Sequence, residues 1–240
     1  MIGTLVSVTL RGLLNRRRTL LLALLAGLIV LVAGVFQLSG PSQDAALDFT
    51  AGLLANVGLA ALLPLVAVIA GTAALGSELD DGTIVYLLAK PVPRALIVTV
   101  KLLVCWVVVT CLVSLPILAA GIVGGTAVLG GAYAVAAAVG ALEYSAIFLA
   151  LSLLTSRALI IGLAYVVVWE GVVATLFEGT RILSVRQHAL AVADALGGEA
   201  AISAEVAVGT AVVFAAVVTL VAYLVAVRRL QGVELRGETS

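Results

Sequence analysis

Residues 19–38 read "TLLLALLAGLIVLVAGVFQL", a run that contains no charged side chain. A helix that crosses a membrane needs about 20 mostly apolar residues, because the hydrocarbon core of a bilayer is about 30 Å thick. Further stretches of this kind follow at 51–75, 102–123, 132–154, 158–177 and 206–227. Backbone amides in lipid must hydrogen-bond within their own segment. The sequence therefore predicts an all-α integral membrane protein with six transmembrane helices in a single domain.

The composition also indicates that most of the chain is surrounded by lipid. The chain has 240 residues, of which 63% are hydrophobic and 11% are charged, and its formal net charge is zero. A globule of this size has too little interior to bury so much apolar surface. Neutral charge, without a basic cluster interleaved with aromatics, gives no reason to expect a nucleic-acid partner.

The basic residues predict the orientation. Of the 13 Lys and Arg residues, all except Arg181 and Arg186 lie before span one, between spans two and three or four and five, or after span six. Positive loops favour the cytoplasm, so both termini are predicted to be cytoplasmic. The apolar run at 19–38 exceeds a typical signal-peptide core of about 7–15 residues, so we expect a retained anchor.

Residues 1–18 precede the first span and have helical amphipathicity. Apolar side chains fall on one side, and polar or basic ones on the other. Such a helix is typical of the membrane interface, with arginines near lipid head groups. The alternative is a basic flank that only sets the topology. The arginines concerned are Arg11, Arg16, Arg17 and Arg18.

The segment 76–101, between spans two and three, is unusually polar and begins "GSELDDGTIVYLLAKPVPR". Its acids, Glu78, Asp80 and Asp81, suit the start of a short helix, where Asp can cap the first turn. Gly82 permits a turn. Pro91 and Pro93 prevent the helix from continuing. Arg94 and Lys101 are then expected to return the chain to the membrane surface.

Apolar side chains within this segment form a stripe at i, i+3 and i+4, made by Ile84, Leu87 and Leu88. A stiff apolar ridge displayed in water is suited to docking into a groove on a soluble partner. The alternative is a capped helix that lies on the inner face of the membrane. The other long connection, 178–205, is predicted to be an outer loop, in which 188–198 forms a short helix on the membrane or dipping into it.

The pattern E-x-x-D-G-T-I-x-Y-L-L-A-K-P-V-P-R-x-x-I-x-x-x-K, from Glu78 to Lys101, resembles the ABC-2 type permeases, the membrane subunits of ATP-binding-cassette transporters. The segments "LEYSAIFLALSLLTSR" (142–157) and "YVVVWEGVV" (165–173) are similar to the fourth and fifth spans of that family. The initial amphipathic helix, six spans and internal termini agree with it.

The resemblance implies that two permeases, identical or not, form a pathway above two cytoplasmic ATPase subunits in a prokaryotic plasma membrane. The loop with Asp81, Gly82 and Thr83 would be the coupling helix. The turn with Ser156 and Arg157 and the amino-terminal helix would be further contacts. The chain lacks a G-x-x-x-x-G-K-[ST] loop, so it is not expected to be an enzyme. ATP and Mg²⁺ would bind the partner, which would drive export of a hydrophobic or amphipathic substrate.

Two acids lie inside predicted spans, Glu143 and Glu170. Because a buried carboxylate in lipid costs at least about 2.5–3.5 kcal/mol, both should face protein or water. One interpretation makes them pathway residues that bind a cationic substrate or carry a proton. The other makes them structural. Pro64 and Pro116 interrupt the spans on either side of the coupling segment, either as kinks or as tolerated prolines.

Other functions remain as alternatives. A proton-coupled secondary transporter would use Glu143 and Glu170, and a membrane scaffold or sensor would transport nothing. An intramembrane serine protease is disfavoured, because the sole histidine, His188, falls in the predicted outer loop. No metal site is expected, since the sole methionine is Met1 and the two cysteines are not arranged as ligands.

Overall fold

The computed structural model describes residues 2–13, 16–80, 93–198 and 201–232, and within these ranges it contains helices and no strands. Six helical stretches are long and apolar enough to cross a membrane, which confirms the prediction. They comprise α2 (Arg16–Leu38), the continuous run of α3 (Gln43–Leu53), η1 (Leu54–Leu62) and α4 (Leu63–Asp80), α6 (Arg94–Gly124), α7 (Ala127–Leu154), the run of α8 (Ala158–Tyr165), η2 (Val166–Val173) and α9 (Ala174–Leu176), and α11 (Val208–Gln231).

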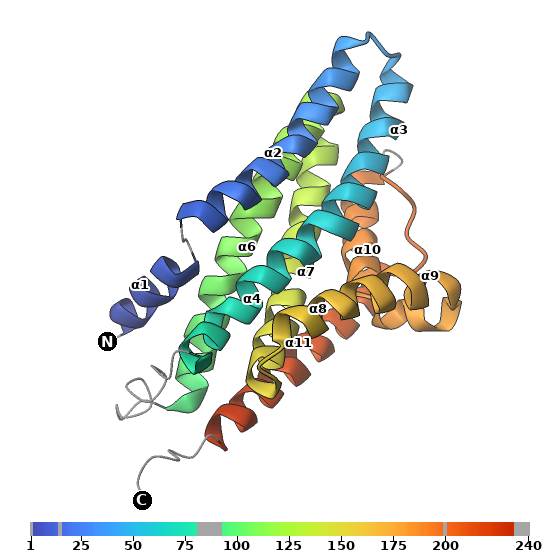
Figure 1. Ribbon diagram of the computed structural model, residues 1–240. Coiled ribbons are helices and arrows are strands. Elements are labelled where there is room, and N and C mark those ends of the chain that lie inside the picture. The colour runs from blue at the N-terminus through green and yellow to red at the C-terminus, as the bar shows by residue number, and fades with distance from the viewer. Residues whose placement is uncertain (1, 14–15, 81–92, 199–200, 233–240) are drawn as a thin grey trace, which may run out of the picture.

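The helices form one bundle with α7 at its centre, where it packs against α4, α6, α10 and α11. The start of α1 (Ile2–Leu13) and the end of α11 lie at the same end of the bundle (Figure 1). The end of α4 and the start of α6 lie there too. The connection from α2 to α3 lies at the opposite end. Six crossings, an even number, bring the two termini to the same end of the bundle. That this end is cytoplasmic stays a prediction from the charge distribution.

Several spans are longer than predicted. The second begins at Gln43 rather than 51, because Ser42 caps the helix by accepting a hydrogen bond from the amide of Ala45 at 3.3 Å. Thr126 caps α7 in the same way, with the amide of Leu129 at 3.2 Å, so that helix begins at Ala127 rather than 132. Hydropathy locates the apolar part of a span, whereas a cap determines where the helix starts.

The prediction that Lys101 returns the chain to the membrane surface was wrong. Helix α6 already starts at Arg94, and Lys101 lies two turns inside it with only 1% of its surface exposed. Its Nζ donates a hydrogen bond to the carbonyl oxygen of Ala74 at 2.6 Å. A buried ammonium requires such an acceptor. Lys101 therefore joins α6 to α4.

The predicted amino-terminal helix is present, but it is shorter than expected. Helix α1 ends at Leu13, and Arg16–Arg18 open α2, so only Arg11 belongs to α1. Val6, Leu10 and Leu13 pack against the hydrophobic core of the bundle, where α1 contacts α4 and α6. These three side chains of the apolar side, which we expected to rest on lipid, thus pack on protein. An interfacial position for this helix stays a prediction.

The two predicted kink prolines lie in different surroundings. Pro64 is the second residue of α4, just beyond the π-helical stretch η1, at whose end the amide of Leu63 donates to the carbonyl of Gly58, five residues back. Pro116 lies inside α6, which continues as one helix from Arg94 to Gly124. Departure from α-helical bonding therefore accompanies Pro64 and not Pro116. Bending during function stays a prediction for both.

The hairpin of α6 and α7 depends on a contact between two glycines. A Cβ atom added at Gly130 would lie 2.7 Å from the carbonyl oxygen of Leu118 and 3.2 Å from the Cα of Gly121. These neighbours belong to the backbone, so the helices could accommodate a methyl group only by separating. Small residues at such crossings are typical of packing between membrane helices.

We predict that Gly130→Ala lowers the free energy of unfolding by about 1–3 kcal/mol, because overpacking forces the two backbones apart. Unfolding in sodium dodecyl sulfate, followed by circular dichroism, measures the change. Gly131→Ala is the matched control, since a Cβ there meets nothing within 4 Å. Equal stability of the two variants would contradict a tight crossing.

Candidate functional site: a polar cluster beneath α10

The segment 178–205 is not an outer loop in the simple sense that the sequence suggested. It contains a 3₁₀ helix, η3 (Glu178–Leu183), and α10 (Val185–Gly197), which confirms a helix near 188–198. Helix α10 packs along α7 and also contacts α11 and η1 (Figure 1). One face of α10 is buried, and its residues are Val185, His188, Ala189, Leu190, Ala191, Val192 and Ala193.

Glu170 binds the amino terminus of α10. It lies in the π-helical stretch η2, where it is the only buried residue. One carboxylate oxygen accepts from the Ser184 hydroxyl at 2.5 Å, and the other accepts from the amide of Val185 at 2.9 Å. An anion at the start of a helix meets unpaired N–H groups and the positive end of the helix dipole. The carboxylate thus holds α10 in place from a different helix.

Glu143 binds the same helix one turn further along. Its Oε2 lies 2.8 Å from Nδ1 of His188, and the two side chains are 1% and 0% exposed. The other ring nitrogen, Nε2, lies 2.9 Å from the carbonyl oxygen of Ile182. The expectation that both intramembrane acids face protein is therefore confirmed. Their partner is α10, which hydropathy had placed outside the spans.

The hydrogen-bond partners of Glu143 and His188 determine how many protons this pair carries. A carbonyl oxygen only accepts, so Nε2 of His188 carries a hydrogen and donates to Ile182. The contact between Nδ1 and Oε2 then needs one further proton, which belongs either to the imidazolium or to the carboxylic acid. In both forms the pair has no net charge. Removal of that proton would place a bare carboxylate against a lone pair in a buried site.

The same contact shifts the titration of His188. Burial lowers the pKa of this imidazole, but the hydrogen bond and the charge of Glu143 outweigh burial and raise the pKa above its ordinary value. The histidine is therefore held in its protonated form to higher pH by the folded chain than by the unfolded chain.

Sequence reasoning missed His188 as a member of the site, because it assigned the residue to an outer loop. The prediction did not include the contact of this segment with Glu143. The histidine does not form a serine–histidine pair, since Glu143 and Ile182 occupy its two nitrogens and Ser184 donates to Glu170. The available signal was the apolar content of "HALAVADAL", which exceeds that of a solvated loop.

Most of the predicted coupling residues lie outside the described part of the chain, namely Asp81, Gly82, Thr83, Ile84, Leu87 and Leu88. Glu78 and Asp80 fall in the last turn of α4, and Arg94 is the first residue of α6. Ser156 and Arg157 form the turn between α7 and α8, where the Thr155 hydroxyl accepts from the amide of Arg157 at 3.2 Å. Helix α4 therefore ends just before the predicted coupling segment, and α6 begins just after it.

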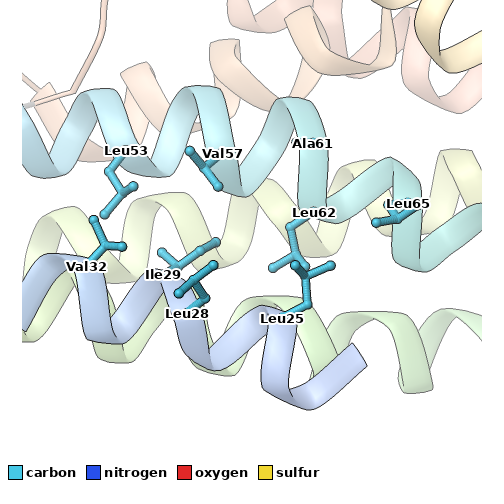
Figure 2. A pocket seen from close by; sticks show the side chains of 9 residues that line it. All are labelled: Leu25, Leu28, Ile29, Val32, Leu53, Val57, Ala61, Leu62 and Leu65. Carbon is cyan, nitrogen blue, oxygen red and sulfur yellow. The ribbon is translucent and has the colours of Figure 1, made fainter. Parts of the chain in front are cut away.

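A groove of about 370 Å³ separates α2 from the run of α3, η1 and α4. Figure 2 shows the apolar side chains that line it, including Leu25 and Leu28 on α2 and Leu53 and Leu62 on the opposite wall. It has no polar side chain. Such a surface suits an acyl chain of the surrounding lipid but provides no group that could select a substrate.

These features define a multi-pass α-helical membrane protein in which two buried acids secure an additional helix. The family model described as "ABC-2 family transporter protein" matches residues 14–185, which cover five of the six spans. The chain belongs to this family, and it is an ABC-2 type permease, a membrane component rather than a catalytic one. A comparison with curated proteins found no match.

We predict that the thermal stability of the purified protein falls as the pH rises above neutrality. Because folding raises the pKa of His188, its contribution is fully present below the unfolded pKa of about 6.5 and is lost as pH passes the folded value. Melting temperatures in detergent between pH 6 and pH 9 measure this loss. The His188→Asn variant should melt at a lower temperature with a flatter profile. An equal slope in both proteins would contradict the assignment.

We also predict that Glu170→Ala loosens α10, because the Ser184 hydroxyl and the Val185 amide lose their acceptor. An unpaired buried donor costs about 1–3 kcal/mol, so amide exchange within α10 should accelerate at least about fivefold. Hydrogen–deuterium exchange of the reconstituted protein provides the measurement. Glu178→Ala is the control, since that carboxylate is exposed. Unchanged exchange in Glu170→Ala would show that the carboxylate does not hold the helix.

Proposed function

We propose that this permease is the membrane subunit of an ATP-driven exporter, in which a second permease completes the pathway and separate cytoplasmic subunits hydrolyse ATP. The family match over residues 14–185 carries the proposal, because it coincides with a bundle of membrane-spanning helices. The residues 76–101 supply the expected coupling segment. The substrate is hydrophobic or amphipathic, in keeping with the apolar groove walls.

The described helices are suited to transmit motion from that segment. Helices α4 and α6 end on either side of residues 81–92, and both extend deep into the bundle. The hydrogen bond from Lys101 to Ala74 fastens them to each other about two turns from the segment. A partner that displaced residues 81–92 would therefore move α4 and α6 together, as a rigid pair, against α7.

The chain leaves nucleotide chemistry to its partner. Its only lysines are Lys90 and Lys101, and no phosphate-binding loop precedes either of them. Lys101 is buried against α4. ATP and Mg²⁺ would accordingly bind the ATPase subunit, where phosphates are cradled by backbone amides and a lysine.

The charge distribution supports a cytoplasmic location for the coupling end, in the plasma membrane of a prokaryote. Arg228 and Arg229 close α11 at the end of the bundle where α1 begins (Figure 1). The segment between α9 and α11, by contrast, contains only two arginines, Arg181 and Arg186. Loops rich in Lys and Arg close to the spans are retained on the cytoplasmic side.

We predict that the double variant Leu87→Asp/Leu88→Asp abolishes co-purification of the ATPase, because an acidic stripe cannot enter an apolar cleft. The tagged permease, extracted in mild detergent from the host cell, is analysed by mass spectrometry for bound ATP-binding-cassette subunits. The control is Leu38→Asp, which changes an exposed residue at the end of α2, away from the coupling segment. If the double variant retained its ATPase at wild-type stoichiometry, the coupling role of this segment would be wrong.

A further inference from the structure

A second groove lies between α6, α7 and α11, and it differs from the first in having an acid in its wall. Its volume is about 480 Å³, within the range of small-molecule sites, and its lining is mainly aliphatic. The polar side chains that contribute to it are Glu143, Thr219 and Tyr223. A groove of this size with a few convergent polar groups has the composition of a ligand site.

Glu143 still has an open position for a donor. Its Oε2 is occupied by His188, but its Oε1 has no hydrogen-bond partner in the described part of the chain. Only 1% of the residue is exposed. A buried carboxylate oxygen without a donor is costly. An unmet acceptor on a residue that lines an otherwise apolar groove indicates a ligand that brings a donor with it.

The charge of the surrounding cluster favours a cationic donor. Two carboxylates, Glu143 and Glu170, lie near one imidazole, His188. If both carboxylates are ionised and the imidazole is protonated, these groups carry one net negative charge. The guanidinium of Arg186, the other basic residue on α10, donates from Nη2 to Oδ1 of Asn56 on η1 rather than to either carboxylate. A cation at Oε1 would complete both the charge and the hydrogen bonding.

We propose that this groove is a binding site for a lipophilic amine, whose ammonium group donates to Oε1 of Glu143 while its hydrocarbon body lies along the aliphatic wall of α11. The inference rests on the permease function proposed above, because it names the substrate class of that pathway. Access is from the side of the bundle, since Ala216 and Leu220 are exposed at the groove. An amphipathic amine dissolved in the bilayer would reach the groove without crossing water.

The test compares two probes of equal shape, the protonated amine aminoadamantane and the uncharged adamantanol. Each is measured by equilibrium dialysis against the full-length chain in nanodiscs of phosphatidylcholine, with empty nanodiscs as background. We expect the amine to bind at least about tenfold more tightly than the alcohol, the ratio that one charge-assisted hydrogen bond provides. Equal binding would overturn the proposal and indicate a site for lipid chains.

Variants locate the site. Ala216→Phe fills the groove from an exposed position and should abolish binding of the amine, whereas Val217→Phe, on the neighbouring exposed position outside the groove, should leave it unchanged. Glu143→Gln should remove the preference for the amine over the alcohol. Unchanged binding to Ala216→Phe would overturn the proposal even if Glu143→Gln failed to fold.

The result is independent of the ATPase, which is absent from the nanodiscs. A permease that binds the amine but recruits no ATPase would contradict the proposed function alone. A permease that recruits the ATPase but does not distinguish amine from alcohol would contradict this inference alone.

Discussion

Two carboxylates buried in a bundle that faces lipid need hydrogen-bond donors, and helix α10 supplies them. Glu170 accepts from Ser184 and from the amide of Val185 at the start of α10, and Glu143 shares a proton with His188. The cost of leaving a carboxylate unpaired in this environment is high enough to fix the position of a helix that has no span of its own. The packing of α10 on α7 follows from these contacts.

The same cluster contains the group that, in our proposal, lets the permease recognise a charged substrate. A permease wall of Leu, Val, Ala and Gly selects nothing by itself, whereas an acid with an unmet oxygen would select for charge under our proposal. The acid is held rigidly, because its other oxygen is fixed by His188. Structural and pathway interpretations of Glu143 are therefore compatible, one for each carboxylate oxygen. For Glu170, the hydrogen bonds of both oxygens to Ser184 and Val185 favour the structural interpretation.

The proposed mechanical link lies at the other end of the bundle. Lys101 fastens α6 to α4, and both helices flank the segment whose sequence resembles a coupling helix. Between the two regions runs α7, which contacts both of these helices as well as α10. A displacement of the pair α4–α6 against α7 would alter the walls near Glu143, which α6 and α7 share with α11. This arrangement places coupling and binding on one continuous set of packed helices.

The sequence by itself determined the number of spans, their helical nature and the shared side of the termini, because hydropathy and the backbone's need for hydrogen bonds act locally. It also predicted that Glu143 and Glu170 face protein or water rather than lipid. Only the tertiary structure decided which protein groups they face, since His188 lies 45 residues from Glu143 in the chain. The burial of Lys101 escaped prediction for the same reason: its acceptor, the carbonyl of Ala74, belongs to another helix. Pairings between distant residues depend on how helices pack, which periodicity within one helix does not encode.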